Sequence, residues 1–162
     1  MLIISGLMKP ALSGRFGFLV NEVSRLYSQQ FDRLARERLG LSQAQCRLLA
    51  VLAWHEGDEA LSQVELAQKL GLTAMAVATM CDRLAAAGWI ERRAHPGDRR
   101  VNHLHIEPGA RKALEQAMHL ADELTAATLS GLNATERKQL LALLARARTG
   151  LLAAAAAAED AA

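Results

Sequence analysis

The chain has 162 residues, of which 51% are hydrophobic and 22% are charged, and its net charge at pH 7 is +2. These values indicate one globular domain with a sizeable core, and they exclude a protein that binds polyanions through an overall excess of positive charge. The segment Met1 to Leu7 is apolar, but it is short and lacks the basic start of a secretory signal. Since no membrane-spanning stretch is evident either, we expect a cytoplasmic protein with no membrane partner.

The first predicted helix runs from Gly14 to Gly40, after an N-terminal extension of residues 1–13. Its apolar side chains recur at helical spacing and form one packing face, and Gly40 supplies the stop. That face carries Leu19, Val23, Leu26, Phe31 and Leu34.

A second helix is predicted to begin at Ser42, because Gln45 stands three residues later and completes a capping-box sequence. Its inner stripe would consist of Cys46, Leu49, Leu52 and Ala53. Cys46 and Cys81 both fall on predicted helices, so we expect reduced thiols rather than a disulfide.

The next two helices are joined by a single glycine turn, which predicts a helix-turn-helix. The first begins with another capping-box sequence, Ser62 to Glu65, and ends at Gly71, where a left-handed conformation is favoured. The second runs from Thr73 to Ala87 and stops at Gly88. Its buried face would consist of Val77, Met80, Leu84 and Ala87. In such a unit the second helix faces outward and fits the major groove of DNA.

A β-hairpin is predicted directly after this helix. Trp89 to Arg93 and Val101 to Ile106 are β-prone runs, and the pair Pro96-Gly97 between them marks a turn. Four arginines stand around the turn against one acidic residue: Arg92, Arg93, Arg99 and Arg100, with Asp98. An Arg-rich loop taken alone is most simply a solvated surface. Placed after a helix-turn-helix, its positive charge suits phosphates or a narrow minor groove.

Two more helices complete the chain. One spans about Ala110 to Ser130, and the last is capped by Asn133 with Glu136 three residues on. The last helix has an apolar stripe that is wide enough to need a partner surface, formed by Leu140, Leu141, Leu144, Ala147 and Leu151. Residues 151–162 form an alanine-rich tail with little to pack, for which disorder and a terminal helix are equally defensible.

Several short pieces of the sequence, in this order and at this spacing, resemble regulators of the MarR family. They are Leu39-Gly40-Leu41-Ser42 with Gln45, Leu66-Ala67 with Leu70-Gly71, Asp82-Arg83-Leu84 with Gly88, and Asp98-Arg99-Arg100 followed by Leu104-His105-Ile106 and Gly109. One departure is Ile106-Glu107-Pro108, where family members usually have Leu-Thr-Glu. Proline is well tolerated at a helix start, so this change should only tighten the entry to the next helix.

The resemblance implies a mainly α fold with a small β-hairpin wing, in which residues 14–150 form a winged helix-turn-helix domain. The DNA-binding lobe would span about 42–107, and helices at about 14–40 and 110–150 would build a homodimer. Such a protein is a repressor or activator of transcription that binds double-stranded DNA. A two-lobed dimer should favour an inverted-repeat operator with half-sites about 10 base pairs apart.

The outward face of the predicted reading helix is chemically plain. With Val77 toward the core, Thr79 and Arg83 are the side chains on this face that offer hydrogen-bond donors. The wing arginines and DNA shape should therefore carry much of the specificity, and by resemblance Asp98 holds a wing arginine in place. We expect DNA contacts from Ser62, Gln63, Thr73, Ala74, Met75, Ala76, Ala78, Thr79, Arg83, Arg92, Arg93, His95, Asp98, Arg99 and Arg100.

The resemblance also implies an effector pocket between the dimer-forming helices and the DNA-binding lobe. The residues expected to line it are Arg15, Phe18, Arg47, Trp54 and His55. Arginine and histidine would hold an aromatic carboxylate, and the rings of the aromatic residues would stack on it. Core packing is the simpler explanation for the aromatic residues.

Other functions remain as alternatives. A winged helix can act as a protein-interaction module. Oxidation of Cys81 would tilt the reading face, and His103 with His105 could share a zinc ion if a third ligand came near, so a thiol- or metal-responsive regulator is a further alternative. His55-Glu56 lacks the second histidine of a metalloprotease helix, and no serine or cysteine has a recognisable base partner. We therefore expect no enzyme, no cofactor and no metal site.

Overall fold

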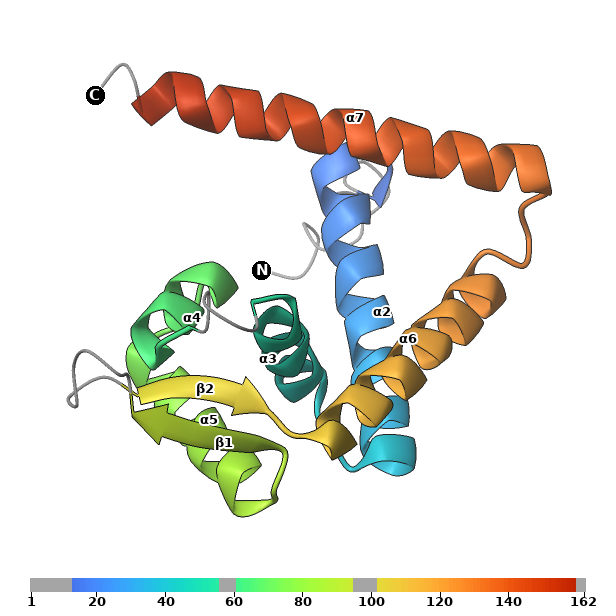
Figure 1. Ribbon diagram of the computed structural model, residues 1–162. Coiled ribbons are helices and arrows are strands. Elements are labelled where there is room, and N and C mark those ends of the chain that lie inside the picture. The colour runs from blue at the N-terminus through green and yellow to red at the C-terminus, as the bar shows by residue number, and fades with distance from the viewer. Residues whose placement is uncertain (1–12, 56–60, 95–101, 160–162) are drawn as a thin grey trace, which may run out of the picture. The chain divides into compact units, whose positions relative to one another are not determined.

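The computed structural model describes residues 13–55, 61–94 and 102–159 (Figure 1). These residues form helices and one two-stranded antiparallel hairpin. The prediction of a mainly α fold with a small β-hairpin wing is therefore confirmed.

The chain divides into two units, residues 1–124 and residues 125–162. The first unit contains helices α2 to α5, both strands and most of α6 (Pro108–Thr128). The second contains the end of α6 and the whole of α7 (Ala134–Glu159).

Helix α2 (Phe16–Leu39) differs between its two halves. It ends at Gly40, whose φ of 69° lies in the left-handed region that favours glycine. In the second half Phe31 and Ala35 are buried. The apolar side chains of the first half are exposed, namely Phe16, Phe18, Leu19, Val20, Val23 and Leu26. Of the predicted apolar face, the C-terminal part packs within the first unit and the N-terminal part does not.

Both predicted capping boxes start helices in the first unit. Ser42 and Gln45 exchange two hydrogen bonds, of 3.2 and 2.8 Å, at the start of α3 (Gln43–Trp54). The corresponding bonds between Ser62 and Glu65, of 3.3 and 2.8 Å, start α4 (Gln63–Leu70). Since each box satisfies backbone N–H groups that a helix start leaves open, these residues define where the helices begin.

Helix α5 (Ala74–Ala86) buries Val77, Cys81 and Leu84. The prediction placed Met80 and Ala87 on this face instead of Cys81. Met80 is only half-buried and Ala87 is exposed, so the buried face is turned slightly from the predicted one. Cys81 packs there because it is a small, weakly polar side chain at the correct spacing from Val77 and Leu84.

The hairpin consists of β1 (Ile90–Ala94) and β2 (Asn102–Ile106), with Ile90 paired to Ile106 and Arg92 to Leu104. The strands begin one residue later than predicted. A bridge between Ser62 and His103 ties β2 to the segment that precedes α4, and Leu104 N donates to the carbonyl of Leu61 at 3.1 Å. The hairpin is thus held to the helix-turn-helix along its second strand.

The core of the first unit lies between α3, α4, α5, the hairpin and the facing parts of α2 and α6. Helix α6 begins with Pro108, and it buries Ala110, Ala113, Ala117 and Leu120. Small alanine side chains allow α6 to approach its neighbours closely. The salt bridge between Arg38 and Glu123, at 2.7 Å, joins the ends of α2 and α6 at the surface.

In the second unit, Asn133 and Glu136 form the predicted capping box at the start of α7, with bonds of 2.8 and 3.0 Å. No described residue of α7 is buried. By length and composition α7 could cross a membrane, but Arg146 and Arg148 stand in its middle. Each arginine at a bilayer centre costs about 2.5–3.5 kcal/mol on insertion scales. A protein partner therefore suits this apolar helix better than lipid does.

Candidate nucleic-acid interface

The turn between α4 and α5 is fixed at both of its ends. Gly71 has a φ of 65°, and the N–H of Leu72 donates to the carbonyl of Ala67 at 3.0 Å, which closes the end of α4. Thr73 Oγ1 then accepts the N–H of Ala76 at 3.2 Å and starts α5. Since one face of α5 is buried, this geometry leaves the opposite face open to solvent.

Most residues on the open face of α5 were predicted to contact DNA. Exposed there are Thr73, Ala74, Met75, Ala76, Thr79 and Arg83, whereas Ala78 is half-buried. Met75 is the most prominent, with 80% of its surface exposed. The hydroxyl of Thr79 donates to the carbonyl of Met75 at 3.0 Å, so toward an outside partner it acts as an acceptor. This face is suited to contacts with thymine methyl groups rather than to a dense hydrogen-bond pattern.

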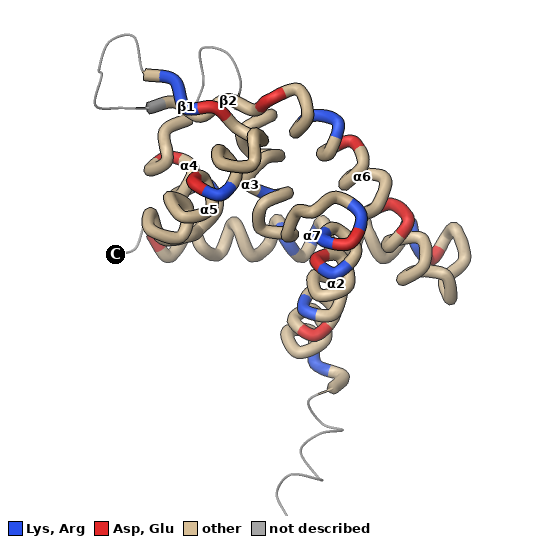
Figure 2. The backbone as a smooth tube through the Cα atoms, turned by 90° about the horizontal axis from the view of Figure 1, so that it is seen from below, with Lys and Arg blue, Asp and Glu red and all other residues tan. Residues whose placement is uncertain are grey.

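Two of the predicted wing arginines are engaged by acidic residues. Arg92 Nη2 lies 2.6 Å from Asp82 Oδ1 on α5, and Arg93 Nη2 lies 2.7 Å from Glu91 Oε2 on the same strand. Both arginines belong to β1 rather than to the tip of the hairpin, and Figure 2 shows basic residues on β1 beside the loop. The prediction missed the role of Asp82, although its place on the outward face could have suggested a basic partner.

The four residues predicted at the tip of the wing, His95, Asp98, Arg99 and Arg100, lie outside the described residues. The expected support of an arginine by Asp98 therefore stays a prediction.

Ser62 and Gln63 sit at the start of α4, and their polar groups have partners within the chain. The N–H of Ser62 and then its Oγ each donate to Glu65 Oε2 at 2.8 Å, and these two bonds hold the pKa of Glu65 below its ordinary value. The side chain of Gln63 reaches the buried thiol of Cys81. Ser62 therefore has a structural role at the start of α4 and Gln63 a contact within the chain, besides the predicted DNA contacts.

Comparisons with known proteins agree with this geometry. A family model described as the MarR family matches residues 39–101. The uncharacterized HTH-type transcriptional regulator YdgJ of Bacillus subtilis (strain 168) is 29% identical over 112 residues, which are 69% of this chain and 66% of that protein, just under two thirds of its length. The solved structure of wild-type MarR (apo form) from E. coli is similar at a TM-score of 0.72 with 25% identity, and the match covers 82% of this chain and 96% of that one. The chain is thus similar to MarR-family regulators in both sequence and fold.

A structure of the S. aureus MepR-DNA complex has the same fold, with a TM-score of 0.66 and 23% identity over 85% of this chain and 96% of that one. The fold of this chain thus agrees with solved structures beyond the segment that the family model matches.

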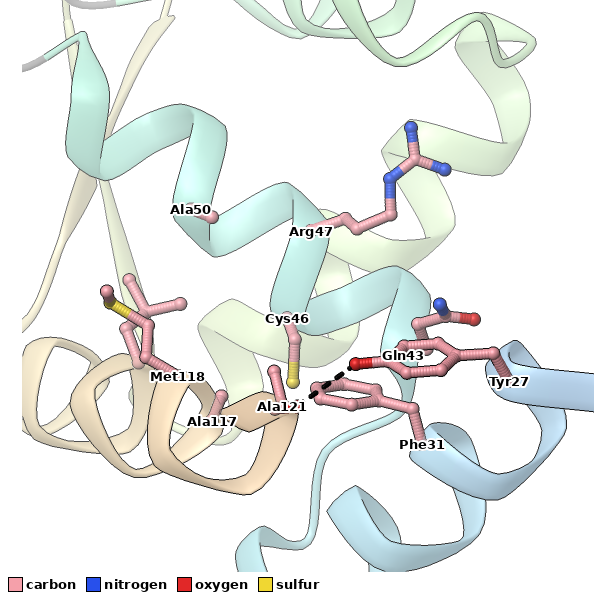
Figure 3. Close-up of a pocket in the computed structure, with 10 residues that line it drawn as sticks. Tyr27, Phe31, Gln43, Cys46, Arg47, Ala50, Ala117, Met118 and Ala121 are labelled. Carbon is pink, nitrogen blue, oxygen red and sulfur yellow. Dashed lines mark hydrogen bonds between the residues drawn. The ribbon is translucent and has the colours of Figure 1, made fainter. Parts of the chain in front are cut away.

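The first unit also contains a cavity of about 250 Å³ between α2, α3 and α6. It is lined by Tyr27, Phe31, Gln43, Cys46, Arg47, Ala50, Leu114, Ala117, Met118 and Ala121. Figure 3 shows the rings of Tyr27 and Phe31 near Cys46, while the guanidinium of Arg47 points away from them. The inner lining is therefore largely apolar.

Of the five residues predicted for an effector pocket, Arg47 alone lines this cavity. Trp54 is 87% exposed at the end of α3, and Phe18 is exposed in the first half of α2. Arg15 precedes α2 as its N-cap, and His55 Nδ1 contacts the carbonyl of Val51 at 2.9 Å. The structure thus does not gather the predicted set, because Phe18 and Trp54 lie at distant ends of their helices. Tyr27 and Phe31, roughly two and a half and three and a half helical turns farther along α2, take the place expected for Phe18.

The two cysteines are buried, and neither is disulfide-bonded. Burial raises the pKa of each thiol to about 11. A thiol with such a pKa is protonated at neutral pH and is a poor nucleophile. Within the described ranges no group of three or more histidine, cysteine or acidic residues could hold a metal ion.

Proposed function

We propose that this chain is a double-stranded-DNA-binding transcriptional repressor that acts in the cytoplasm as a homodimer. The observation that carries the proposal is the exposed face of α5, which follows a rigid turn and stands beside a hairpin. We call α5 the recognition helix and the hairpin the wing. The MepR-DNA complex and the regulator name of the B. subtilis relative support this function.

The unpartnered apolar faces of α2 and α7 support the homodimer. Exposed leucines run along α7 at Leu141, Leu143, Leu144, Leu151 and Leu152, and the first half of α2 is similarly apolar. Exposed apolar patches of this size mark interaction surfaces. A second copy would cover both faces, and its two-fold symmetry would place two recognition helices on an inverted repeat.

The cavity between α2, α3 and α6 is the proposed site for a small effector. Its apolar lining and the outward direction of Arg47 favour a mainly apolar ring, in place of the aromatic carboxylate expected from the sequence. Helix α3 packs against α4, so a molecule seated against α3 would act directly on the helix-turn-helix. A ligand that prefers one arrangement of these helices shifts DNA affinity through that preference.

Selection of bound duplexes from random DNA with the purified protein tests the proposal. An inverted repeat should be enriched, and its affinity should fall with salt at a log-log slope near −0.9 for each neutralised phosphate, because phosphate binding releases counterions. The protein is a repressor if a reporter gene placed behind the selected site is expressed more strongly when the protein is absent. Absence of any duplex binding would favour the protein-interaction module instead.

A further inference from the structure

One arginine of the wing lies on the inner face of the hairpin. Side chains two residues apart leave a strand on the same face, so Arg92 shares its face with Ile90. Ile90 and Leu104, which is opposite Arg92, are 3% and 2% exposed, and this face is therefore the one that packs on the core. Only 33% of the Arg92 side chain is exposed. Its aliphatic stem covers the edge of the core while its guanidinium reaches the recognition helix.

The partner of Arg92 is Asp82, an acidic residue on the open face of the recognition helix. Its Oδ1 accepts a 2.6 Å hydrogen bond from Arg92 Nη2, and its side chain is 66% exposed. An uncompensated carboxylate at this place would repel the phosphates of a bound duplex. The guanidinium compensates this charge, and it also joins the recognition helix to β1.

Backbone bonds also tie the wing to its surroundings. Trp89 N donates to the carbonyl of Leu84 at 2.9 Å at the base of the wing, and Leu104 N donates to Leu61 at 3.1 Å on the far strand. Farther along β1 than Trp89, the pair of Arg92 and Asp82 adds a side-chain link. Without it the outer part of β1 loses its direct side-chain link to α5.

We propose that Arg92 is a positioning residue for DNA recognition: its ion pair with Asp82 fixes the angle between the wing and the recognition helix, and Arg92 itself holds no phosphate. The inference rests on the DNA-binding function proposed above. It changes the role that the sequence predicted for Arg92, from a DNA contact to a support.

Arg93 provides a matched control. It carries the same charge on the next residue of β1, but it points to the opposite face and pairs with Glu91 at 2.7 Å. Replacing either arginine by alanine changes the net charge equally. A difference between Arg92→Ala and Arg93→Ala therefore reports the link to the recognition helix rather than electrostatic attraction.

The test measures affinity for the selected duplex and for a scrambled one, at several salt concentrations. Arg92→Ala and Asp82→Ala should each weaken binding to the selected duplex by about tenfold, and the double variant should be no weaker than the worse single variant, because one interaction is lost in all three. The exchanged pair, Asp82→Arg with Arg92→Asp, should recover most of the affinity.

The salt slope of Arg92→Ala should equal that of the unchanged protein. A slope reduced by about 0.9, without recovery in the exchanged pair, would identify Arg92 as a phosphate contact and overturn the inference.

Hydrogen exchange on the free protein tests the link without DNA. The amides of β1 and β2 should exchange about tenfold faster in Arg92→Ala and Asp82→Ala than in Arg93→Ala, since local opening becomes easier while the thermal midpoint stays the same. Equal exchange in all three variants would contradict the inference. If the unchanged protein binds no duplex, the proposed function fails, and the exchange result still decides whether the pair holds the wing.

Discussion

The hydroxyl of Tyr27 donates a 3.1 Å hydrogen bond to the backbone carbonyl of Ala121, and this bond joins α2 to α6 beside the apolar cavity (Figure 3). The carbonyl of Ala121 lies within α6 and keeps its helical bond if the hydroxyl is removed. Tyr27→Phe should therefore lower the free energy of unfolding by only about 1 kcal/mol, the typical net contribution of one hydrogen bond. Urea unfolding of both proteins measures the difference. A loss above about 3 kcal/mol would mean that the bond also holds other structure in place.

Filling the cavity should separate ligand response from DNA binding. Ala50 lines the cavity from α3 and is exposed, so Ala50→Phe can occupy the space without crowding the buried core. We expect operator affinity without ligand to remain, and the effect of an apolar aromatic ligand on that affinity to disappear. Titration of ligand against operator binding checks this.

Ala44→Phe is the control for this prediction, because Ala44 is exposed on the same helix but does not line the cavity. A ligand response that survives Ala50→Phe, or that is lost equally in Ala44→Phe, would place the effector elsewhere.

The sequence predicted every helix that the structure describes. Its predictions were most accurate for the residues at which the helices begin. Ser42, Ser62, Thr73 and Asn133 begin their helices because capping depends on neighbours within three residues, and such local interactions can be read from the chain. The strand β1 began one residue later than predicted, because its limits depend on pairing with β2.

The candidate site was less predictable because its partners lie far apart in the sequence. No local pattern joins Arg92 to Asp82, ten residues earlier, and the pocket forms where Tyr27, Cys46 and Met118 meet from three different helices. Periodicity indicates which side chains leave the same face of an element. It does not indicate which elements come together, so it could not show that this cavity takes Tyr27 and Phe31 rather than Phe18 from α2.

Buried thiols should make the protein less stable at high pH. The folded pKa of both cysteines, about 11, is above the ordinary value of 9.0. The stability that the two buried thiols contribute is therefore fully present below pH 9. It is lost as the pH rises from 9 toward 11, because the thiols of the unfolded chain ionise first. Unfolding free energies across this range should fall less steeply in Cys46→Ala than in the unchanged protein.

The same thiols should react slowly with iodoacetamide at pH 7 and rapidly after unfolding in urea, as mass spectrometry would show. Rapid modification of the folded protein at neutral pH would instead support a thiol-responsive regulator.

The capping box of α4 should stabilise the protein less at acidic pH than at neutral pH. Bonds from Ser62 lower the pKa of Glu65 from 4.5, so this stabilisation is present above pH 4.5 and is lost as the pH falls through the lower folded value. Ser62→Ala should cost about 1 kcal/mol at pH 7. In Glu65→Gln the acid-dependent part should disappear, because the amide accepts similar bonds without titrating.

The box formed by Ser42 and Gln45 serves as the reference, since it has the same geometry and no titrating group. Chemical denaturation at pH 7 and pH 3.5 compares Ser42→Ala with Ser62→Ala. An equal pH dependence of the two losses would show that Glu65 does not cause it.

A negative charge in the exposed apolar faces should dissociate the proposed homodimer. Val23 on α2 and Leu144 on α7 are 56% and 42% exposed, although both are apolar. In a dimer that buries these faces, Val23→Glu or Leu144→Glu would place an unpaired carboxylate in an apolar interface, which costs several kcal/mol per ion.

Gln139→Glu adds the same charge at an exposed polar position of α7 and should leave the dimer intact. Sedimentation measurements should find monomers for the first two variants and a dimer for the third, and operator affinity should fall with dissociation because two half-sites are no longer bound together. Dimers that persist in both Val23→Glu and Leu144→Glu would mean that another surface joins the two copies.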